Sequence, residues 1–137
     1  MADIEKNKEI VRKAAQYLND RSVDKLLDLL GDAEGSWSIP FRSDKFSFGG
    51  FKDKAAFREI ISGFLGGFSE FKFEIKNLTA EEDRVVMEAE SQGKGPGSAS
   101  YKNNYLLIFF IKNGKIHTVR ERFDPFEVLE YVSQFPS

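Results

Sequence analysis

The sequence contains no cysteine, and this absence removes several kinds of site at once. Without thiols the chain cannot form disulfides, use a cysteine nucleophile or bind a metal through thiolates. It also has a single histidine, His117, so a metal site with several histidine ligands is excluded. We therefore expect no metal site of either kind.

The chain also lacks a long apolar run and a strong excess of charge of either sign. Its longest apolar run, residues 105–111, is far too short to span a bilayer, and its N-terminus lacks the basic-then-apolar pattern of a signal peptide. With 20 basic and 22 acidic residues, the net charge of -2 gives no reason to expect a nucleic acid or an anionic membrane as a partner. We expect a soluble, cytoplasmic protein.

The sequence is rich in aromatic residues. It contains 14 phenylalanines against four tyrosines and one tryptophan, which favours an aromatic core or pocket. A chain of 137 residues is long enough to bury a core without disulfides, and we expect one domain over residues 1–137.

The apolar period changes once along the chain. Helical spacing predicts helices over residues 3–19, from a cap at Ser22 to Gly31, and from Asp53 to Gly66-Gly67. Residues 34–48 read as a short strand or hairpin with a loop. From Phe71 onward the period is two, which predicts a four-stranded antiparallel meander. The fold class is therefore α+β, with N-terminal helices packed on a mainly antiparallel sheet and a short C-terminal helix.

The last two strands carry the most informative pattern. Asn113-Gly114 lies between two β-rich runs and predicts a tight hairpin turn, since both residues must take φ > 0. On the second strand Val119, Glu121 and Phe123 share a face, while Arg120 and Arg122 point the other way. Glu121 is thus a carboxylate on an apolar face.

Two interpretations of Glu121 remain open from the residues alone. Burial without a partner raises the pKa of a carboxyl group and makes it a general acid or base near neutral pH. Alternatively, an arginine or lysine of a neighbouring strand forms a salt bridge with it. Asp124 is better explained as a helix cap, because Pro125 follows it at N1, and His117 as a residue close to the turn.

Residues 106–111 are apolar on both faces of their strand. Helices can cover one face, so the other needs a second layer. We expect that layer to be a second copy of the chain, which gives a homodimer through the sheet.

Several motifs resemble a known family. The sequence contains Asp83-Arg84-Val85-Val86-Met87-Glu88, Tyr101-x-Asn103-x-Tyr105, Asn113-Gly114-Lys115-Ile116 and Arg120-Glu121-Arg122-Phe123-Asp124. Their order and spacing resemble the SnoaL-like branch of the cone-shaped nuclear transport factor 2-like superfamily. The ending from Arg120 to Phe126 most resembles the phenazine-biosynthesis A/B proteins.

The resemblance implies a fold, a partner and a site. The fold is a cone of helices and a curved sheet around an apolar pocket, the sheets pair into homodimers, and no metal is used for the chemistry. Glu121 falls where the phenazine proteins carry an acid/base glutamate and where limonene epoxide hydrolase carries a catalytic aspartate. The resemblance also puts Trp37 and Tyr101 on pocket positions. Together with the alternation of the last strands, it predicts a set of ligand-binding residues beside Glu121: Trp37, Phe41, Arg58, Tyr101, Asn103 and Phe123.

The sequence also departs from the family's known enzymes. Arg58 replaces the pocket histidine of the phenazine proteins. The partners of the epoxide hydrolase aspartate fall on Ala89 and Ser91, so its water-activating trio is incomplete. The acids of ketosteroid isomerase would fall near Ser38 and Leu106, which disfavours that activity.

These observations lead to one function and one alternative. We expect the protein to bind a small, apolar, cyclic or aromatic ligand in a pocket of roughly 300–1,000 Å³. As an enzyme it would use Glu121 in a cofactor-free isomerisation, cyclisation or condensation, with Tyr101 and Asn103 orienting a carbonyl or hydroxyl. The alternative is a non-catalytic ligand-binding or protein-association domain in which a salt bridge neutralises Glu121.

Overall fold

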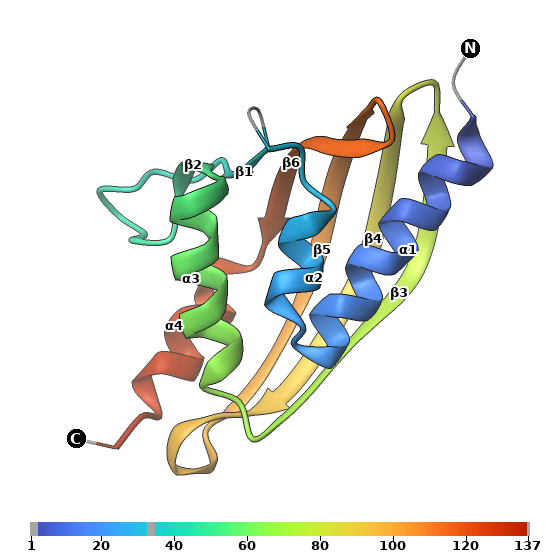
Figure 1. Ribbon diagram of the computed structural model, residues 1–137. Coiled ribbons are helices and arrows are strands. Elements are labelled where there is room, and N and C mark those ends of the chain that lie inside the picture. Colours follow the sequence, from blue (N-terminus) through green and yellow to red (C-terminus); the bar gives the residue numbers. More distant parts are fainter. Residues whose placement is uncertain (1–2, 33–34, 137) are drawn as a thin grey trace.

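The computed structural model describes residues 3–32 and 35–136 as a curved sheet with helices on one face (Figure 1). Helices α1 (Ile4–Asp20), α2 (Val23–Asp28) and α3 (Lys54–Gly66) lie across the inner face of the sheet, and α4 (Pro125–Ser133) lies near the C-terminus. Within the described ranges, no helix is both long and apolar enough to cross a membrane.

The sheet has six strands in the order β2-β1-β6-β5-β4-β3. Their bounds are β1 Ser36–Ile39, β2 Gly50–Asp53, β3 Glu70–Glu81, β4 Arg84–Lys94, β5 Ser100–Lys112 and β6 Lys115–Phe123. Strands β3 to β6 form the predicted antiparallel meander. The short strand expected within residues 34–48 is β1, which adds to β6 in parallel. Strand β2 was not expected, and it pairs with β1.

Local sequence signals account for most element ends. Asp3, Asp53 and Asp124 each cap a helix by accepting a hydrogen bond from a backbone N–H of the first turn. Asn113 and Gly114 both have φ > 0, as the predicted hairpin turn requires. Helix α2 differs from its prediction, since it ends at Asp28 and the Ser22 side chain makes no capping bond.

The alternation of β6 places its side chains as predicted. Val119 is fully buried beneath the helices, whereas Arg120 is exposed on the outer face and its guanidinium lies 4.9 Å from the ring centroid of Phe110. The core of the sheet packs against α1 and α2 through side chains such as Val11, Leu26 and Phe109. A second cluster, which includes Phe68, Tyr101 and Tyr131, joins the sheet to α4.

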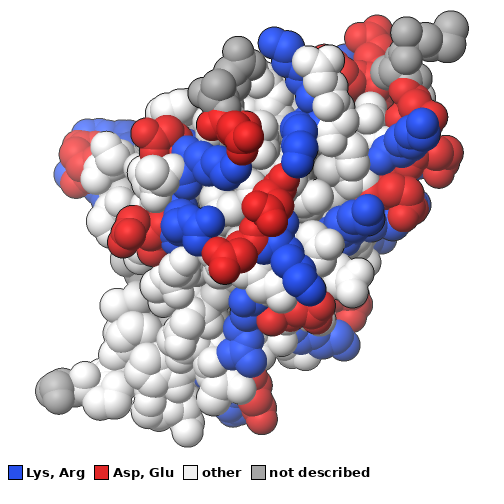
Figure 2. Space-filling view, viewed as in Figure 1, with Lys and Arg blue, Asp and Glu red and all other residues white. Residues whose placement is uncertain are grey.

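Charge is distributed unevenly over this surface. Charged side chains cover α1, α2 and the first half of α3, while the area over the second half of α3 and over α4 is almost uncharged (Figure 2). Exposed apolar residues of that region include Phe126, Leu129 and Val132 on α4.

Candidate functional site

A small cavity lies between the inner face of the sheet, helix α3 and helix α4. Its volume is about 70 Å³. The lining residues are Ile39, Phe48, Phe57, Ile60, Ile61, Phe64, Tyr101, Tyr105, Glu121, Phe123 and Val128. All but three of these side chains are apolar, and the three polar ones converge from β5 and β6. The cavity is smaller than the expected range for a ligand pocket.

A larger hollow of about 480 Å³ lies over the outer face of the sheet, where β3, β4 and the first half of β5 run side by side. It is open to solvent, and charged side chains such as Lys72, Lys76 and Glu90 line it. These charges pair with one another on an exposed surface, for example Lys76 with Glu74 and Glu90. The small cavity therefore offers the better candidate site, since it combines apolar walls with a few convergent polar groups.

Glu121 occupies the cavity wall without an ion-pair partner. Its cross-strand neighbour on β5 is Leu107, and its Oε1 accepts a hydrogen bond of 2.8 Å from Nε1 of Trp37. Among the ion pairs of the described residues, none within 4.0 Å includes Glu121. The salt bridge considered from the sequence does not form.

The surroundings of Glu121 favour its neutral form. Burial raises the pKa of this carboxyl from 4.5 to about 7, although the Trp37 hydrogen bond and the positive charge of Lys52 act in the opposite direction. The side chain keeps some accessible surface, which is consistent with its place in the cavity wall. A carboxyl group with this pKa can both accept and release a proton near neutral pH.

Two tyrosine hydroxyls of the cavity belong to a buried hydrogen-bond chain. The Tyr105 hydroxyl lies 2.8 Å from Oγ of Ser91 and 2.9 Å from the Tyr101 hydroxyl. All three residues are buried. Burial raises the pKa of both tyrosines, so the hydroxyls stay protonated and can donate hydrogen bonds.

Asn103 fixes the direction of this chain at Tyr101. Its Oδ1 accepts from the backbone N–H groups of Asn104 and Asp124, so the amide orientation is determined. Its Nδ2 donates to the Tyr101 hydroxyl at 2.9 Å. The Tyr101 oxygen therefore accepts from Asn103, and its own proton is left for Tyr105 or for a ligand oxygen in the cavity.

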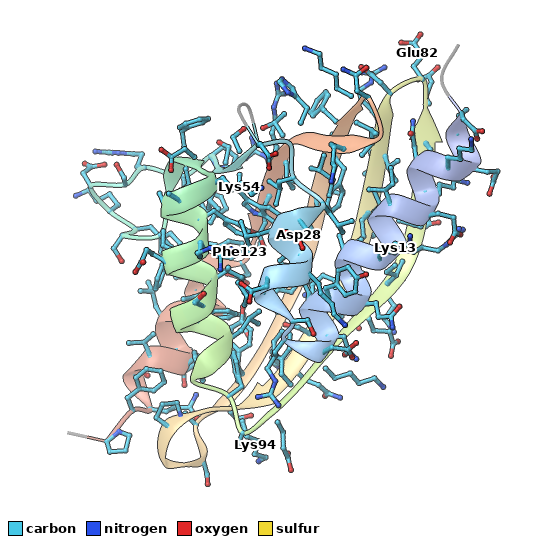
Figure 3. The ribbon with its side chains drawn as sticks, in the orientation of Figure 1. Lys13, Asp28, Lys54, Glu82, Lys94 and Phe123 are labelled. Carbon is cyan, nitrogen blue, oxygen red and sulfur yellow. The ribbon has the colours of Figure 1, made fainter. Side chains whose placement is uncertain are left out.

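Some of the predicted residues line the cavity in the structure, and others do not. Glu121, Tyr101 and Phe123 line it, and Phe123 is labelled behind α3 in Figure 3. Trp37 lies outside the lining, stacked on Phe57 at 4.2 Å between ring centroids, and reaches the site through its hydrogen bond to Glu121.

Phe41, Asn103 and Arg58 do not line the cavity. Phe41 packs on Phe123 with 5.4 Å between ring centroids, and Asn103 lies beyond Tyr101. The prediction for Arg58 is corrected, because its guanidinium points outward and pairs with Asp24 at 2.6 Å on the exposed side of α3. A helix has room for only one inward stripe, and Phe57, Ile60, Ile61 and Phe64 occupy it.

Two residues at or near the candidate site were missed from the sequence. Tyr105 shares the alternation of Tyr101 and Asn103, so the period of β5 contained a signal for it. The sequence contained no signal for Lys52, because an apolar pattern would place the neighbouring Phe51 on the inner face instead. In the structure Phe51 is 72% exposed and Lys52 only 5% exposed.

With this geometry in place, comparison with known proteins assigns the chain to a family. The SnoaL-like domain family matches residues 11–119, and the chain belongs to that family. The resemblance seen in the motifs is thereby confirmed at the level of the SnoaL-like, nuclear transport factor 2-like superfamily, and the special likeness to the phenazine proteins stays a prediction.

Individual relatives agree with that assignment. UPF0523 protein C of Dictyostelium discoideum is 28% identical over 123 residues, which cover 85% of this chain and 79% of the relative. An NTF2-like protein from Burkholderia pseudomallei has a TM-score of 0.80 at 17% identity, covering 97% of this chain and 99% of the other. A LEH-like epoxide hydrolase from M. tuberculosis has a TM-score of 0.73 at 15% identity, covering 97% and 93%. The last two likenesses show the fold.

Proposed function

We propose that this SnoaL-like protein binds a small apolar molecule that carries one carbonyl or hydroxyl oxygen, and that Glu121 moves a proton on it. The observation that supports this most is the state of Glu121: a carboxyl in an apolar cavity wall, with a pKa of about 7 and no ion pair among the described residues. General acid–base catalysis is most effective when the catalytic pKa lies near the working pH.

The tyrosine chain supplies the second half of the proposed chemistry. Tyr101 can donate its hydroxyl proton to a ligand oxygen, while Ser91 and Tyr105 can pass hydrogen bonds toward it. A donor held in place by Asn103 stabilises negative charge as it develops on that oxygen. Glu121 would then remove a proton from the adjacent carbon, which gives an enolate hydrogen-bonded to Tyr101. The protonated Glu121 would return that proton to another carbon of the ligand in an isomerisation, or to the oxygen of the carbonyl that the enolate attacks in a cyclisation or condensation, so no cofactor is needed.

The size of the cavity limits the ligand. An apolar cavity of about 150 Å³ can bind benzene, and the cavity here has about half that volume. The proposed ligand is therefore small, or it displaces side chains such as Phe48 and Phe64 when it enters. The isomerase, cyclase or lyase expected from the sequence would act on a correspondingly compact substrate.

Proton exchange on small ketones tests this proposal. Acetone and cyclopentanone in D₂O report abstraction of the proton next to the carbonyl, because deuterium replaces it. We expect the wild type to accelerate exchange over buffer, Glu121→Gln to lose the acceleration, and Glu59→Gln, an exposed carboxylate of α3, to keep it. Saturation-transfer NMR on the same ketones detects binding.

The alternative function has its own support. The small volume of the cavity and the apolar outer face of β5 both suit a non-catalytic domain that binds a ligand or another protein. Binding of the ketones without exchange would favour a ligand-binding protein, and the absence of both would favour an association domain. Either result would contradict proton transfer by Glu121 on this class of ligand.

We also propose that two copies pair through the outer face of the sheet. Leu106 is 40% exposed there, and Ile108 and Phe110 follow it on the same face. Leu106 lies between Glu88 of β4 and Arg122 of β6, so a two-fold axis could set opposite charges against each other. Sedimentation should give twice the monomer mass, and Ile108→Glu should give the monomer. A monomeric wild type at micromolar concentration would contradict the dimer.

A further inference from the structure

Lys52 is a buried lysine that the proposed mechanism has not used. It is 5% exposed, and its Nζ donates to the carbonyl oxygens of Gly49 at 3.1 Å and Gly50 at 3.4 Å. Burying an ammonium group is costly unless other groups compensate its charge. The two carbonyls satisfy hydrogen bonds but carry no net charge, so a compensating anion should lie nearby.

The register of the sheet brings Lys52 to the same face as Glu121. Lys52 of β2 pairs with Trp37 of β1, and Trp37 pairs on its other side with Val119 of β6. Glu121 is two residues beyond Val119 and shares its face. Strand β1, which carries Trp37, therefore lies between the strand of the ammonium and the strand of the carboxylate, and Nε1 of Trp37 donates to the carboxylate.

Among the described residues, the other elements around Glu121 place no charged side chain in the cavity wall. Strand β5 contributes the neutral hydroxyls of Tyr101 and Tyr105, and helices α3 and α4 contribute only apolar side chains to the cavity wall. Strand β1 contributes the uncharged indole of Trp37. Of the described residues, Lys52 is the one whose charge acts on the Glu121 carboxyl.

We propose that Lys52 is a positioning residue that acts through Glu121: its ammonium, held by the Gly49 and Gly50 carbonyls, is the counter-charge of the ionised carboxylate. The two groups are too far apart for a salt bridge, so Glu121 remains able to reach a ligand. This arrangement keeps a substantial fraction of Glu121 ionised near neutral pH despite its apolar wall. The inference rests on the proposed role of Glu121, but its test needs no substrate.

The effect is mutual, since each charge stabilises the other. Burial lowers the pKa of Lys52, and the charge of Glu121 counteracts that decrease. Removing the ammonium should therefore raise the pKa of Glu121, and removing the carboxylate should lower the pKa of Lys52. Exposed charges elsewhere on the surface are screened by solvent and should have no comparable influence.

NMR titration of the Glu121 carboxyl carbon measures the first effect, with Glu121→Gln used to assign the signal. We expect Lys52→Met to raise the pKa of Glu121 by about half a pH unit or more, because a nearby opposite charge lowers a carboxyl pKa. Lys52→Arg should restore the wild-type value. Lys54→Met is the matched control, since Lys54 pairs with the exposed Asp32 at 3.1 Å. Lys54 is labelled at the N-terminal end of α3 in Figure 3.

An unchanged pKa of Glu121 in folded Lys52→Met would overturn the proposal, and so would an equal rise in Lys54→Met. If Lys52→Met does not fold, the reciprocal measurement decides. The pKa of Lys52, followed through its Cε signal, should fall in Glu121→Gln relative to the wild type, and an unchanged value would overturn the proposal. If ketone exchange fails while both titrations shift as expected, the proposed reaction is wrong and the role of Lys52 stands.

Discussion

The inner face of strand β5 has two halves that are equally buried and chemically different. Leu107, Phe109 and Ile111 form the apolar half, which the helices α1 and α2 cover. Tyr101, Asn103 and Tyr105 form the polar half, which borders the cavity. In the described part of the chain, no buried side-chain nitrogen or oxygen lacks a hydrogen-bond partner.

The difference shows how the fold separates stability from chemistry. The apolar half stabilises through close packing alone, because its side chains have no polar atoms to satisfy. The polar half must keep each hydroxyl and amide paired, and it does so through Ser91, Asn103 and the backbone of Asp124. Glu121 stands at the boundary, opposite Leu107, with one oxygen bound by Trp37. Polar groups converge where the packing leaves a cavity.

The largest effect is expected in the apolar half. Leu107→Ala should lower the free energy of unfolding by about 2–5 kcal/mol, because it removes a buried side chain and leaves a cavity. Urea denaturation measures this loss. Leu129→Ala, at a position 52% exposed on α4, should change stability by no more than about 0.5 kcal/mol. Equal losses in the two variants would contradict the division between packed core and surface.

The next effect concerns Glu121 and depends on pH. Its pKa is raised in the folded state, so the protonated side chain favours folding at low pH and that contribution is lost as pH rises through about 7. A rise from 4.5 to about 7 corresponds to about 3 kcal/mol. Glu121→Gln should therefore gain stability relative to the wild type, by up to that amount at pH 8 and by little near pH 4.

Melting temperatures of both proteins between pH 4 and pH 8 test this expectation. Glutamine keeps the shape of the side chain and an oxygen that can accept from Trp37. A variant that is less stable at pH 8, with the same pH dependence as the wild type, would show that the carboxylate is well compensated. Glu121 would then be a structural residue.

A smaller loss should follow from Tyr105→Phe in the polar half. The change removes the central hydroxyl of the chain and leaves Ser91 and Tyr101 each without one partner. Leaving buried polar groups unpaired costs about 1–3 kcal/mol. Tyr17→Phe serves as the control, because the Tyr17 side chain on α1 is only half-buried. This change should leave the free energy of unfolding almost unchanged in denaturation experiments. A neutral Tyr105→Phe would mean that water replaces the lost hydroxyl.

The smallest effect is expected for Arg58. Its guanidinium and the Asp24 carboxylate form an exposed pair, and such pairs contribute about 0–1 kcal/mol. Arg58→Ala should change stability by no more than about 0.5 kcal/mol. It should also leave the binding of cyclopentanone in saturation-transfer NMR unchanged. Loss of binding would show that Arg58 belongs to the ligand site, as the family resemblance implied.

Residues that follow local rules were predictable from the sequence. The caps at Asp53 and Asp124, the turn at Asn113-Gly114 and the alternation of Val119, Arg120 and Glu121 are all as expected. Each depends on neighbours within a few positions of the chain. Strand β2 was missed because Gly50–Asp53 is four residues long and has no distinct period.

The site was predictable only in part, and Lys52 shows why. Polarity predicts an exposed Lys52 and a buried Phe51, yet pairing with β1 places Lys52 opposite Trp37 on the inner face. A strand has two faces, and its register with the next strand decides which of them is buried. No pattern within β2 itself carries that information.

The sequence by itself determined the class of the protein, most of its elements and the carboxylate on an apolar face, because those depend on composition and on short-range periodicity. Only the tertiary structure decided which groups surround that carboxylate. Trp37 and Glu121 are 84 positions apart, and Lys52 reaches the same region through two strand pairings. The pKa of Glu121 depends on burial and on these distant neighbours, so it is a property of the packed fold.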